Sequence, residues 1–321
     1  MSLAVQSKPA PPVIAPVETS SASFAVSEER PGACLLCGSS GDKIVAEENG
    51  YVGRHCKCGV VYVDPWPGEE GLAATHDFHV ETYYAFPAKL RFRFIERMFK
   101  KLLGRKGNLL EVGPGPGFTL KMARDAGYDV QSIEPNATCA ERVEAMGIPN
   151  ERSMVEETQL GPVQFDAVFH VDLMSHFADP VRSLKAMKRL LKPDGFLCFE
   201  AAAFGGLSDQ WYQWIGEVGY PQHPWIYSWD ALCELFDRAG LEVVHRDKFN
   251  LFPGTVLSTI GNSVFSRFFP KPKSRSGKPA SPNAIYRWYG YMQYLLRYRV
   301  GRFVPSMGGP SCSLIALRPK A

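Results

Sequence analysis

Four cysteines near the start of the chain have the type and spacing of a metal site. Cys34 and Cys37 form a Cys-x2-Cys pair, and Cys56 and Cys58 follow after 18 intervening residues. Each such turn presents two thiolates about one coordination edge apart, which suits one tetrahedral zinc ion. Cys56-x-Cys58 is tighter than usual, whereas His55-x2-Cys58 has the usual spacing, so His55 is the alternative fourth ligand. We predict zinc bound by the four cysteines, with reduced thiols that hold no metal as the alternative.

A glycine-rich turn, GPGPG at residues 113–117, is the second stretch that predicts chemistry. Residues 109–134 read as a strand, this turn, a helix with apolar residues at helical spacing, and a second strand that ends in Glu134. Such a unit lets the backbone approach a ligand and directs helix N–H groups at an anion, while Glu134 can accept hydrogen bonds from ribose hydroxyls. The dinucleotide fingerprint requires glycine at its sixth position, where this chain has Phe118. We therefore expect a nucleotide-type ligand other than a dinucleotide; a turn used only for chain reversal is the alternative.

The elements that must position these residues alternate between strand and helix. Apolar periodicity beyond Glu134 predicts, in order, a helix over 137–146, an extended piece over 150–155, a strand over 165–172, a helix over 179–191, a KPDG turn at 192–195 and a further strand. This alternation is typical of a parallel sheet with helices on both faces, so the fold class is α/β. Upstream, residues 68–106 are expected to be helical for much of their length, with Leu90, Phe94, Met98 and Leu102 at four-residue spacing.

Length and composition indicate a globular protein. The chain has 321 residues, of which 45% are hydrophobic, enough for one large domain or two smaller ones. It contains no 18-residue apolar run and no signal-peptide pattern, so we expect a cytoplasmic protein without a transmembrane segment. In that compartment, eight cysteines indicate metal binding or free thiols rather than disulfides.

Charge is distributed unevenly along the chain. The net charge is only +3, but residues 261–321 contain 11 of the 36 Lys and Arg residues and no Asp or Glu. The basic C-terminal segment is either a solvated surface or a docking site for something anionic. At the other end, residues 1–30 are rich in Pro, Ala and Ser, and we predict a disordered tail there.

Residues 165–202, FDAVFHVDLMSHFADPVRSLKAMKRLLKPDGFLCFEAA, carry a resemblance to a known family. They are similar to the pattern fDvv…dvLEHlpDP…L…lrrlLkpgG of the class I methyltransferases that bind S-adenosylmethionine. Glu111 followed by GPGPG resembles motif I of that family, and Glu134 follows at the right separation. Together with the cysteine pairs, residues 34–250 resemble the zinc-ribbon-bearing members, many of which act on small molecules. The resemblance implies a Rossmann-like sheet of seven strands, the last antiparallel, with a small N-terminal zinc ribbon.

The resemblance also divides the chain. After the tail over 1–30 that composition predicts, it implies a zinc ribbon over 31–67 and a methyltransferase domain over 68–321. Within that domain we expect strand six at 242–247 and the last strand at 311–318. An aromatic insertion over 204–229 is expected to cover the acceptor pocket, and a basic and aromatic elaboration over 251–308 precedes the last strand. An amphipathic helix over 285–303 could pack on the core, shield the pocket, form a dimer face, or contact an anionic lipid or a carrier protein.

The cofactors implied by the resemblance are S-adenosylmethionine and zinc. The residues predicted to bind S-adenosylmethionine are Glu111, Gly113, Gly115, Gly117, Phe118, Glu134, Pro135, Met154, His170, Val171 and, as a cover, Tyr83. Met154 stands near a position that is often acidic in the family, so we expect it to pack on the adenine face without a charged contact to the adenine amine. Ser175 stands where the family usually has a glutamate before His176, so any role of that glutamate is absent here.

Three histidines are candidates for a general base. Methyl transfer from a sulfonium needs in-line placement and, for a hydroxyl acceptor, the removal of a proton. Histidine is suited to this task near neutral pH. His176 and His223 match recurrent histidines of the family, and His170 at the end of a predicted strand is the third candidate. The alternative for each is a structural histidine that is hydrogen-bonded in a loop.

We interpret the sequence as an S-adenosylmethionine-dependent methyltransferase of natural product biosynthesis that acts on a small molecule. Oxygen is the first choice of methylated atom, ahead of carbon and nitrogen. Trp211, Trp214, Trp225 and Trp229 in the insertion suit an aromatic, apolar or cationic acceptor. The alternative is an RNA methyltransferase that grips phosphates with the ribbon and the basic C-terminus. The ribbon is not strongly basic, so a nucleic-acid partner is not expected. Two further alternatives are other chemistry with the same cofactor and a scaffold without turnover.

Overall fold

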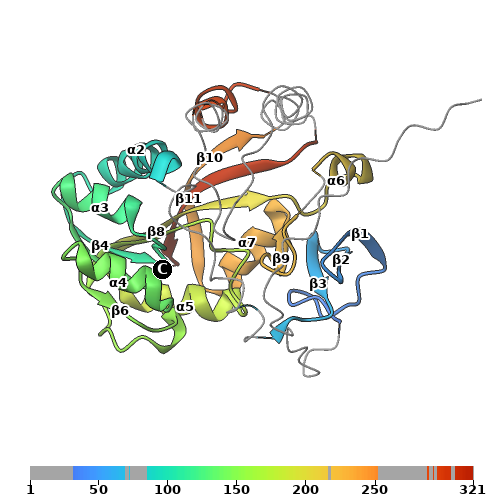
Figure 1. Cartoon of the computed structure of the whole chain (residues 1–321), viewed down its shortest axis with the longest axis horizontal. Coiled ribbons are helices and arrows are strands. Elements are labelled where there is room, and N and C mark those ends of the chain that lie inside the picture. The colour runs from blue at the N-terminus through green and yellow to red at the C-terminus, as the bar shows by residue number, and fades with distance from the viewer. Residues whose placement is uncertain are drawn as a thin grey trace, which may run out of the picture.

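The chain is built around one mixed β-sheet, seen in a computed structural model (Figure 1). The structure describes residues 32–68, 72, 85–215, 218–251, 288, 292, 295–304 and 308–320. The predicted tail over 1–30 and most of the predicted helix over 285–303 lie outside these residues. Among the described helices, none has the length and apolar character needed to cross a bilayer.

The centre of the sheet is parallel. It consists of β4 (Asn108–Val112), β5 (Asp129–Ile133), β6 (Asn150–Glu151), β7 (Phe165–Val171) and β8 (Leu191–Ala203). The spatial order is β6-β5-β4-β7-β8, and neighbouring strands are parallel. Glu111 of β4 therefore lies between Ser132 of β5 and Phe169 of β7. The carboxyl ends of these strands meet at one edge, where α/β sheets bind ligands, and the predicted α/β class is confirmed.

Two further strands complete this side of the sheet. β11 (Ser311–Pro319) runs antiparallel to β8 on one side and to β10 (Leu241–Asn250) on the other, so only β11 of the two runs against β8. The antiparallel last strand is thus confirmed. The predicted turn at 192–195 is wrong, because β8 already begins at Leu191. Leu191 pairs with Phe165, and a shift in register before Ala167 accommodates the intervening residues within the strand.

The N-terminal module, residues 32–68, adds a three-stranded antiparallel meander of β1 (Lys43–Glu48), β2 (Tyr51–His55) and β3 (Val60–Asp64). β3 pairs with the short β9 (Trp225–Tyr227), and β9 pairs with β8 through Ala203 and Tyr227. Among the described residues the sheet holds eleven strands, because β1–β3 of the N-terminal module and β9 continue the sheet that β4–β8, β10 and β11 form. β9 lies in the insertion that was predicted to cover the acceptor pocket, and its free edge pairs with β3 of the N-terminal module.

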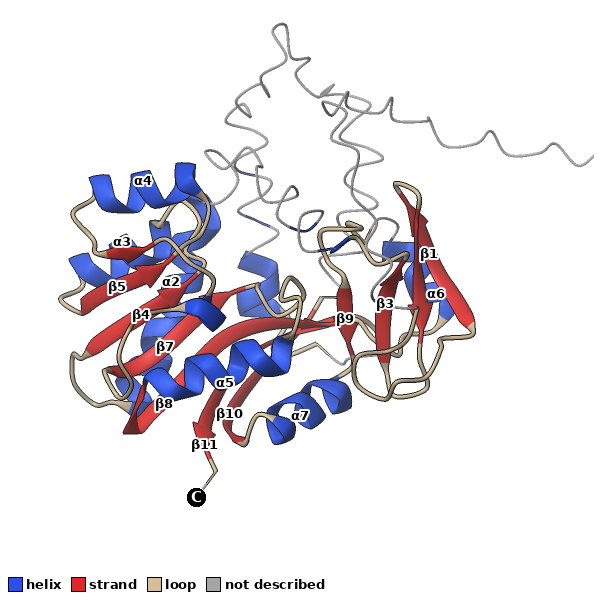
Figure 2. Ribbon diagram, turned by 90° about the horizontal axis from the view of Figure 1, so that it is seen from below, coloured by secondary structure: helices blue, strands red, loops and turns tan. Residues whose placement is uncertain are grey.

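Helices cover both faces of the sheet (Figure 2). The described elements are α2 (Ala85–Leu102), α3 (Phe118–Asp125), α4 (Ala137–Ala145), η1 (Val155–Glu157), α5 (Pro180–Leu190), α6 (Asp209–Ile215), α7 (Trp229–Arg238) and η2 (Leu296–Val300). α4, α5 and α7 each begin at a residue whose side chain accepts a hydrogen bond from a first-turn N–H, namely Asn136, Asp179 and Ser228. The buried side chains form two hydrophobic clusters, one with Phe99, Leu120 and Val143 under α2 to α4, the other with Leu184 and Leu235 under α5 and α7.

Candidate active site

The glycine turn lies directly beyond the carboxyl end of β4. Gly113, Gly115 and Gly117 have φ angles of 59°, 54° and 75°, which side chains rarely adopt. A Cβ at Gly113 would lie 2.5 Å from Leu173 Cδ1, and one at Gly117 would lie 2.9 Å from Val143 Cγ2. At Gly115 a Cβ would meet nothing within 4 Å. Two glycines are therefore required by packing, whereas Gly115 leaves the backbone open toward a ligand.

Glu134 links the ends of β4 and β5. It is buried, and its two carboxylate oxygens accept from the backbone N–H groups of Gly115 and Asn136, both at 2.9 Å. Burial raises the pKa of Glu134, and these two hydrogen bonds oppose the rise. The carboxylate is thus held at the open turn, in the position predicted for a ribose-binding residue.

Glu111 is a second buried carboxyl at this edge. It is 2% exposed, and its Oε2 has no hydrogen-bond partner among the described residues. Burial raises its pKa to about 8, repulsion from Glu134 adds to the rise, and Arg91 opposes it. A buried acceptor without a partner needs an explanation, and a bound ligand that brings a donor is one. S-adenosylmethionine carries such a donor, its ammonium group, so the residues present fit this cofactor.

The other predicted cofactor residues surround the same edge. Phe118 begins α3, whose N-terminus has no side-chain cap, and Pro135 is exposed beyond β5. Met154 precedes η1 and is 46% exposed, so an apolar surface is available to a planar ring. Val171 ends β7 and is half-buried. Tyr83, the predicted cover, lies outside the described residues.

His176 and His223 are brought together from separate loops. Their ring centroids are 4.4 Å apart, with the planes tilted by 56°. Ser175 Oγ lies 2.9 Å from His223 Nδ1. Burial lowers the pKa of His223, while Asp172 and Glu48 oppose the decrease. His223 is therefore a neutral imidazole near neutral pH, with one nitrogen engaged by a hydroxyl.

His170 lies in a different environment. It is fully buried under α5, stacked on Phe199 at 4.5 Å and edge-on to Phe177 at 5.6 Å. Neither ring nitrogen has a partner in the described part of the chain, and burial lowers its pKa to about 3. The predicted role of His170 at the reacting centre receives no support from this placement, because its ring is enclosed by core side chains.

The sequence did not point to several polar residues at this edge. Asp172 follows β7 with φ of 61° and lies 4.0 Å from Arg91, whose Nε lies 3.5 Å from the buried Glu200. Tyr298 of η2 also donates to Glu200. Asp172 could have been found because it directly follows a strand. Arg91 gave no local signal, and the sequence marked Ser175 only as a departure from the family pattern, since its partner His223 is distant in sequence.

The tryptophans of the insertion serve packing in part. Trp225 is buried against Trp66 of the N-terminal module, with ring centroids 5.2 Å apart. The Arg246 guanidinium lies 3.2 Å from the ring centroid of Trp229. The side chain of Trp214 lies outside the described part, and Trp211 packs where a Cβ at Gly309 would be 2.7 Å away. Trp225 and Trp229 are thus engaged by the protein itself.

The four cysteines of the N-terminal module converge. The Sγ atoms of Cys34, Cys37, Cys56 and Cys58 all lie within 4.8 Å of one another. Cys34 Sγ is 3.4 Å from Cys58 Sγ, and Cys37 Sγ is 3.2 Å from Cys56 Sγ. His55, the alternative fourth ligand, does not belong to this group of sulfur atoms. The donor set, four sulfurs from two turns, fits a tetrahedral zinc ion.

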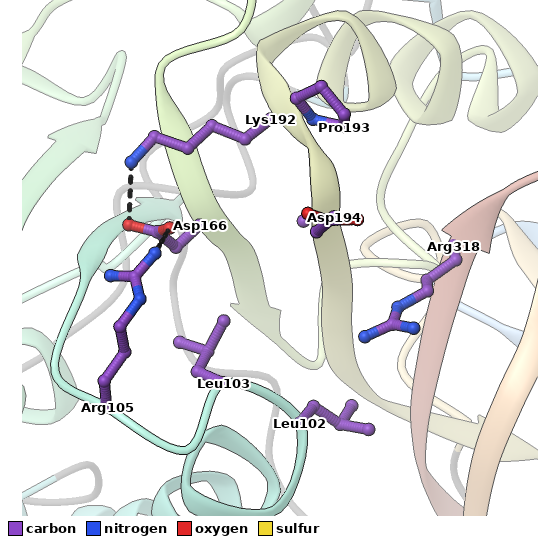
Figure 3. A pocket seen from close by; sticks show the side chains of 9 residues that line it. Leu102, Leu103, Arg105, Asp166, Lys192, Pro193, Asp194 and Arg318 are labelled. Carbon is purple, nitrogen blue, oxygen red and sulfur yellow. Dashed lines mark hydrogen bonds and ion pairs between the residues drawn. The ribbon is translucent and has the colours of Figure 1, made fainter.

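A hollow of about 370 Å³ lies at the opposite end of the sheet (Figure 3). It is lined by the end of α2, the start of β8 and Arg318. Asp166 in its wall is paired with Arg105 at 2.5 Å and with Lys192 at 2.9 Å. It contains none of the predicted site residues, so the candidate active site is the carboxyl edge and not this hollow.

Comparisons with known proteins agree with this geometry. Residues 81–246, about half of the chain, match the family described as "Methyltransferase domain". The Ubiquinone biosynthesis O-methyltransferase of Haemophilus ducreyi is 30% identical over 119 residues, which are 34% of this chain and 50% of that enzyme. The enzyme of the same name from Cereibacter sphaeroides is 25% identical over 152 residues, 43% of this chain and 61% of that enzyme. The chain thus spans about half the length of the curated relatives that it matches.

A solved structure shows the same fold. A sarcosine dimethylglycine methyltransferase candidate from Galdieria sulphuraria aligns with a TM-score of 0.50 at 15% identity, over 78% of this chain and 96% of that one. The glycine turn, the buried acidic residues at the carboxyl edge, the mixed sheet and the family match agree with one another. The chain belongs to the methyltransferase-domain family, which its residues 81–246 match, and its sheet has the fold of a class I methyltransferase domain.

Proposed function

We propose that this enzyme methylates a small molecule, with oxygen as the first choice of acceptor atom and carbon or nitrogen as the others. The observation that carries the proposal is the pair of contacting imidazoles, His176 and His223, with Ser175 on His223 Nδ1. A hydroxyl acceptor must lose a proton, and this pair offers a base. The relatives that are named O-methyltransferases support the same choice.

The chain's own residues divide the work at the cofactor side. When bound, S-adenosylmethionine supplies an electrophilic methyl group on a sulfonium. Glu134 would hold the ribose hydroxyls, Gly115 would leave its backbone open to the ligand, and Glu111 would accept from the ammonium group. Met154 would pack on the adenine. These roles rest on the burial and contacts of the four residues at the carboxyl edge.

His223 would move the acceptor's proton. If its Nδ1–H donates to Ser175 Oγ, the lone pair lies on Nε2, which is then the basic atom. The O–H bond of the acceptor would break and its proton would pass to Nε2, while the oxygen would take the methyl group as the carbon–sulfur bond of the cofactor breaks and S-adenosylhomocysteine leaves. Burial lowers the pKa of His223, which favours the neutral imidazole that a base must present. His176 lies beside this ring and would orient the acceptor.

We further propose that the four clustered cysteines hold zinc, and that the predicted zinc ribbon over 31–67 is a structural module. The close approach of the sulfurs supports this role. The N-terminal module packs on the rest of the protein: β3 pairs with β9, and Trp66 contacts Trp225. This packing favours a structural role for the N-terminal module over the binding of RNA phosphates. It therefore favours a small molecule over RNA as the substrate. A function in natural product biosynthesis stays a prediction.

The test follows the label from S-adenosylmethionine that is tritiated on the methyl group. The full chain is incubated with this compound and a cell extract that contains both RNA and metabolites, and the products are separated by size. We expect tritium in the small-molecule fraction, with loss of the label when His223 is replaced by glutamine. Label in RNA, or no transfer although the cofactor binds, would overturn the proposal.

A further inference from the structure

The segment that carries His223 is fastened to the N-terminal module by one side chain. Glu48, the last residue of β1, accepts hydrogen bonds from three successive backbone N–H groups. Its Oε2 lies 2.7 Å from Gly219 N and 3.0 Å from Tyr220 N, and its Oε1 accepts from Val218 N. Consecutive N–H groups directed at one carboxylate form an anion-binding concavity, and charge-assisted bonds of this kind are stronger than neutral ones.

The surrounding contacts fix both sides of this junction. The turn after β1 is formed by Asn49 and Gly50, both at positive φ, which sets the position of Glu48. Asn49 Nδ2 donates to Tyr220 O at 2.7 Å. The Tyr220 hydroxyl occupies the space where a Cβ at Gly53 would come within 2.1 Å. The glycine at position 53 therefore makes room for the tyrosine.

The junction continues directly into the candidate base. Pro224 O, one residue after His223, accepts from Val63 N of β3 at 3.0 Å, and His223 N donates to Gly219 O at 3.2 Å. His176 and Ser175 contact the His223 ring, and the charges of Asp172 after β7 and Glu48 of β1 raise its pKa. Glu48 thus acts on His223 both through the backbone that it holds and through its charge.

We propose that Glu48 is a positioning residue for the reaction: by holding the N–H groups of residues 218–220, it couples the N-terminal module to the placement of His223. This inference rests on the proposed role of His223 as the base. The N-terminal module then serves the acceptor side of the active site, although its cysteines lie in a separate part of the chain from the cofactor turn. Loss of the module's order would misplace the base.

The test compares Glu48→Ala, Glu48→Gln and the control Glu47→Ala in the full chain. Glu47 is the exposed neighbour of Glu48 on β1. Glu47→Ala therefore changes the net charge by the same amount as Glu48→Ala, in the same strand. Hydrogen exchange by mass spectrometry reports the amides of residues 218–223, and nitrogen-15 NMR of the histidines reports His223. Binding of S-adenosylhomocysteine reports the cofactor edge. None of these measurements needs an acceptor.

In Glu48→Ala we expect exchange over 218–223 to accelerate at least tenfold, with exchange over 113–117 and the affinity for S-adenosylhomocysteine within twofold of wild type. In Glu48→Gln, which keeps the size and one acceptor oxygen, exchange should be intermediate. The pKa of His223 should fall in both variants, because the negative charge that raises it is gone. Glu47→Ala should match wild type.

Two results would overturn the proposal. One is exchange over 218–223 within twofold of wild type in both Glu48 variants. The other is acceleration spread equally over β1 to β3 and over 113–117, which would mean that Glu48 stabilises the fold in general. Full turnover by His223→Gln would refute the proposed role of His223 as the base. It would not affect the hydrogen-exchange result, which by itself decides whether Glu48 holds residues 218–223.

Discussion

At the scale of single residues, the surroundings of the proposed base, His223, say most about its chemistry. His223 combines a lowered pKa with a hydroxyl partner on Nδ1, and these features suit a neutral imidazole that takes a proton. Ser175 stands where the related pattern carries a glutamate, yet its hydroxyl makes this contact. Replacement of a carboxylate by a hydroxyl keeps the ring oriented and leaves out a negative charge that would raise the pKa of His223.

Substitution of this pair should separate base from partner. We expect His223→Gln to lower kcat by about 100-fold or more, the usual worth of a general base. Ser175→Ala should lower kcat about tenfold, because the His223 imidazole remains but loses the hydrogen bond that orients it. Ser175→Thr keeps the hydroxyl and should have a kcat close to that of wild type. Steady-state kinetics across pH would check this. Equal kcat in wild type and His223→Gln would contradict the role and point to an acceptor that needs no base.

Glu111 predicts a second effect, on stability. Its pKa is about 8 in the folded chain and about 4.5 ordinarily. As pH rises between these values, the unfolded chain loses this proton and the folded chain keeps it, so the free energy of unfolding decreases through that window. Glu111→Gln should therefore be more stable than wild type at pH 8, by on the order of 2–4 kcal/mol, with a smaller difference at pH 5.

Denaturant unfolding at the two pH values would measure this difference. Glu242→Gln, on exposed β10 surface, is the control and should follow wild type at both. A difference between Glu111→Gln and wild type that does not grow with pH would mean that Glu111 titrates normally. Removal of a buried functional group commonly raises the stability of a protein and lowers its activity.

At the scale of elements, the glycine turn is proposed to bind the cofactor and the cysteine turns to bind zinc, and each role can be tested by itself. Gly115 and Gly147 both have positive φ, and at both a Cβ would meet open space. Gly147 follows α4 and is not one of the turn residues 113–117. Alanine at either position should cost roughly 1–2 kcal/mol of stability from the left-handed backbone, and only Gly115→Ala should also weaken S-adenosylhomocysteine binding, by tenfold or more.

Calorimetric titration and thermal unfolding of the two variants would check this pair. Equal affinities in Gly115→Ala and Gly147→Ala would show that the open side of the turn does not contact the cofactor.

The cysteine turns predict a metal content. Elemental analysis of the purified chain should give about one zinc per molecule, since four clustered thiolates bind one ion. Cys37→Ser should lose the metal and loosen the N-terminal module, because binding energy of a structural zinc is folding energy. Cys233→Ser, on α7 outside the cluster, should retain the metal. A wild-type chain free of zinc after expression in zinc-supplied cells would refute this site.

The sequence was informative wherever the structure is determined by neighbours along the chain. The GPGPG turn, the helix that follows it and Glu134 lie within one strand–helix–strand unit, so local periodicity was sufficient. The contact of Ser175 with His223 spans 48 residues, and that of Glu48 with Gly219 spans 171. Such contacts depend on how loops meet in space, which no local pattern encodes. The pairing of β9 with the N-terminal module was missed for the same reason, since β9 has three residues and its partner β3 lies far away in the sequence.

At the scale of the whole molecule, the N-terminal module and the methyltransferase sheet share one core. Cys34, Leu36 and Tyr62 belong to the same hydrophobic cluster as Trp225 and Phe199. The sheet continues from β1 through β9 into β8. The prediction of a ribbon over 31–67 as a separate unit stays a prediction, but its packing makes it part of the wall beside the candidate base. The proposed cofactor side and the proposed acceptor side thus belong to one sheet.

The central claim is that the carboxyl edge of this sheet binds S-adenosylmethionine through the glycine turn and Glu134. Calorimetric titration of S-adenosylhomocysteine into the full chain tests it most directly, with Glu134→Ala and the exposed Glu141→Ala as a matched pair from the same region. We predict saturable one-to-one binding by wild type and Glu141→Ala, and a loss of at least tenfold in Glu134→Ala. No binding by wild type, or equal affinity in the two variants, would contradict the account.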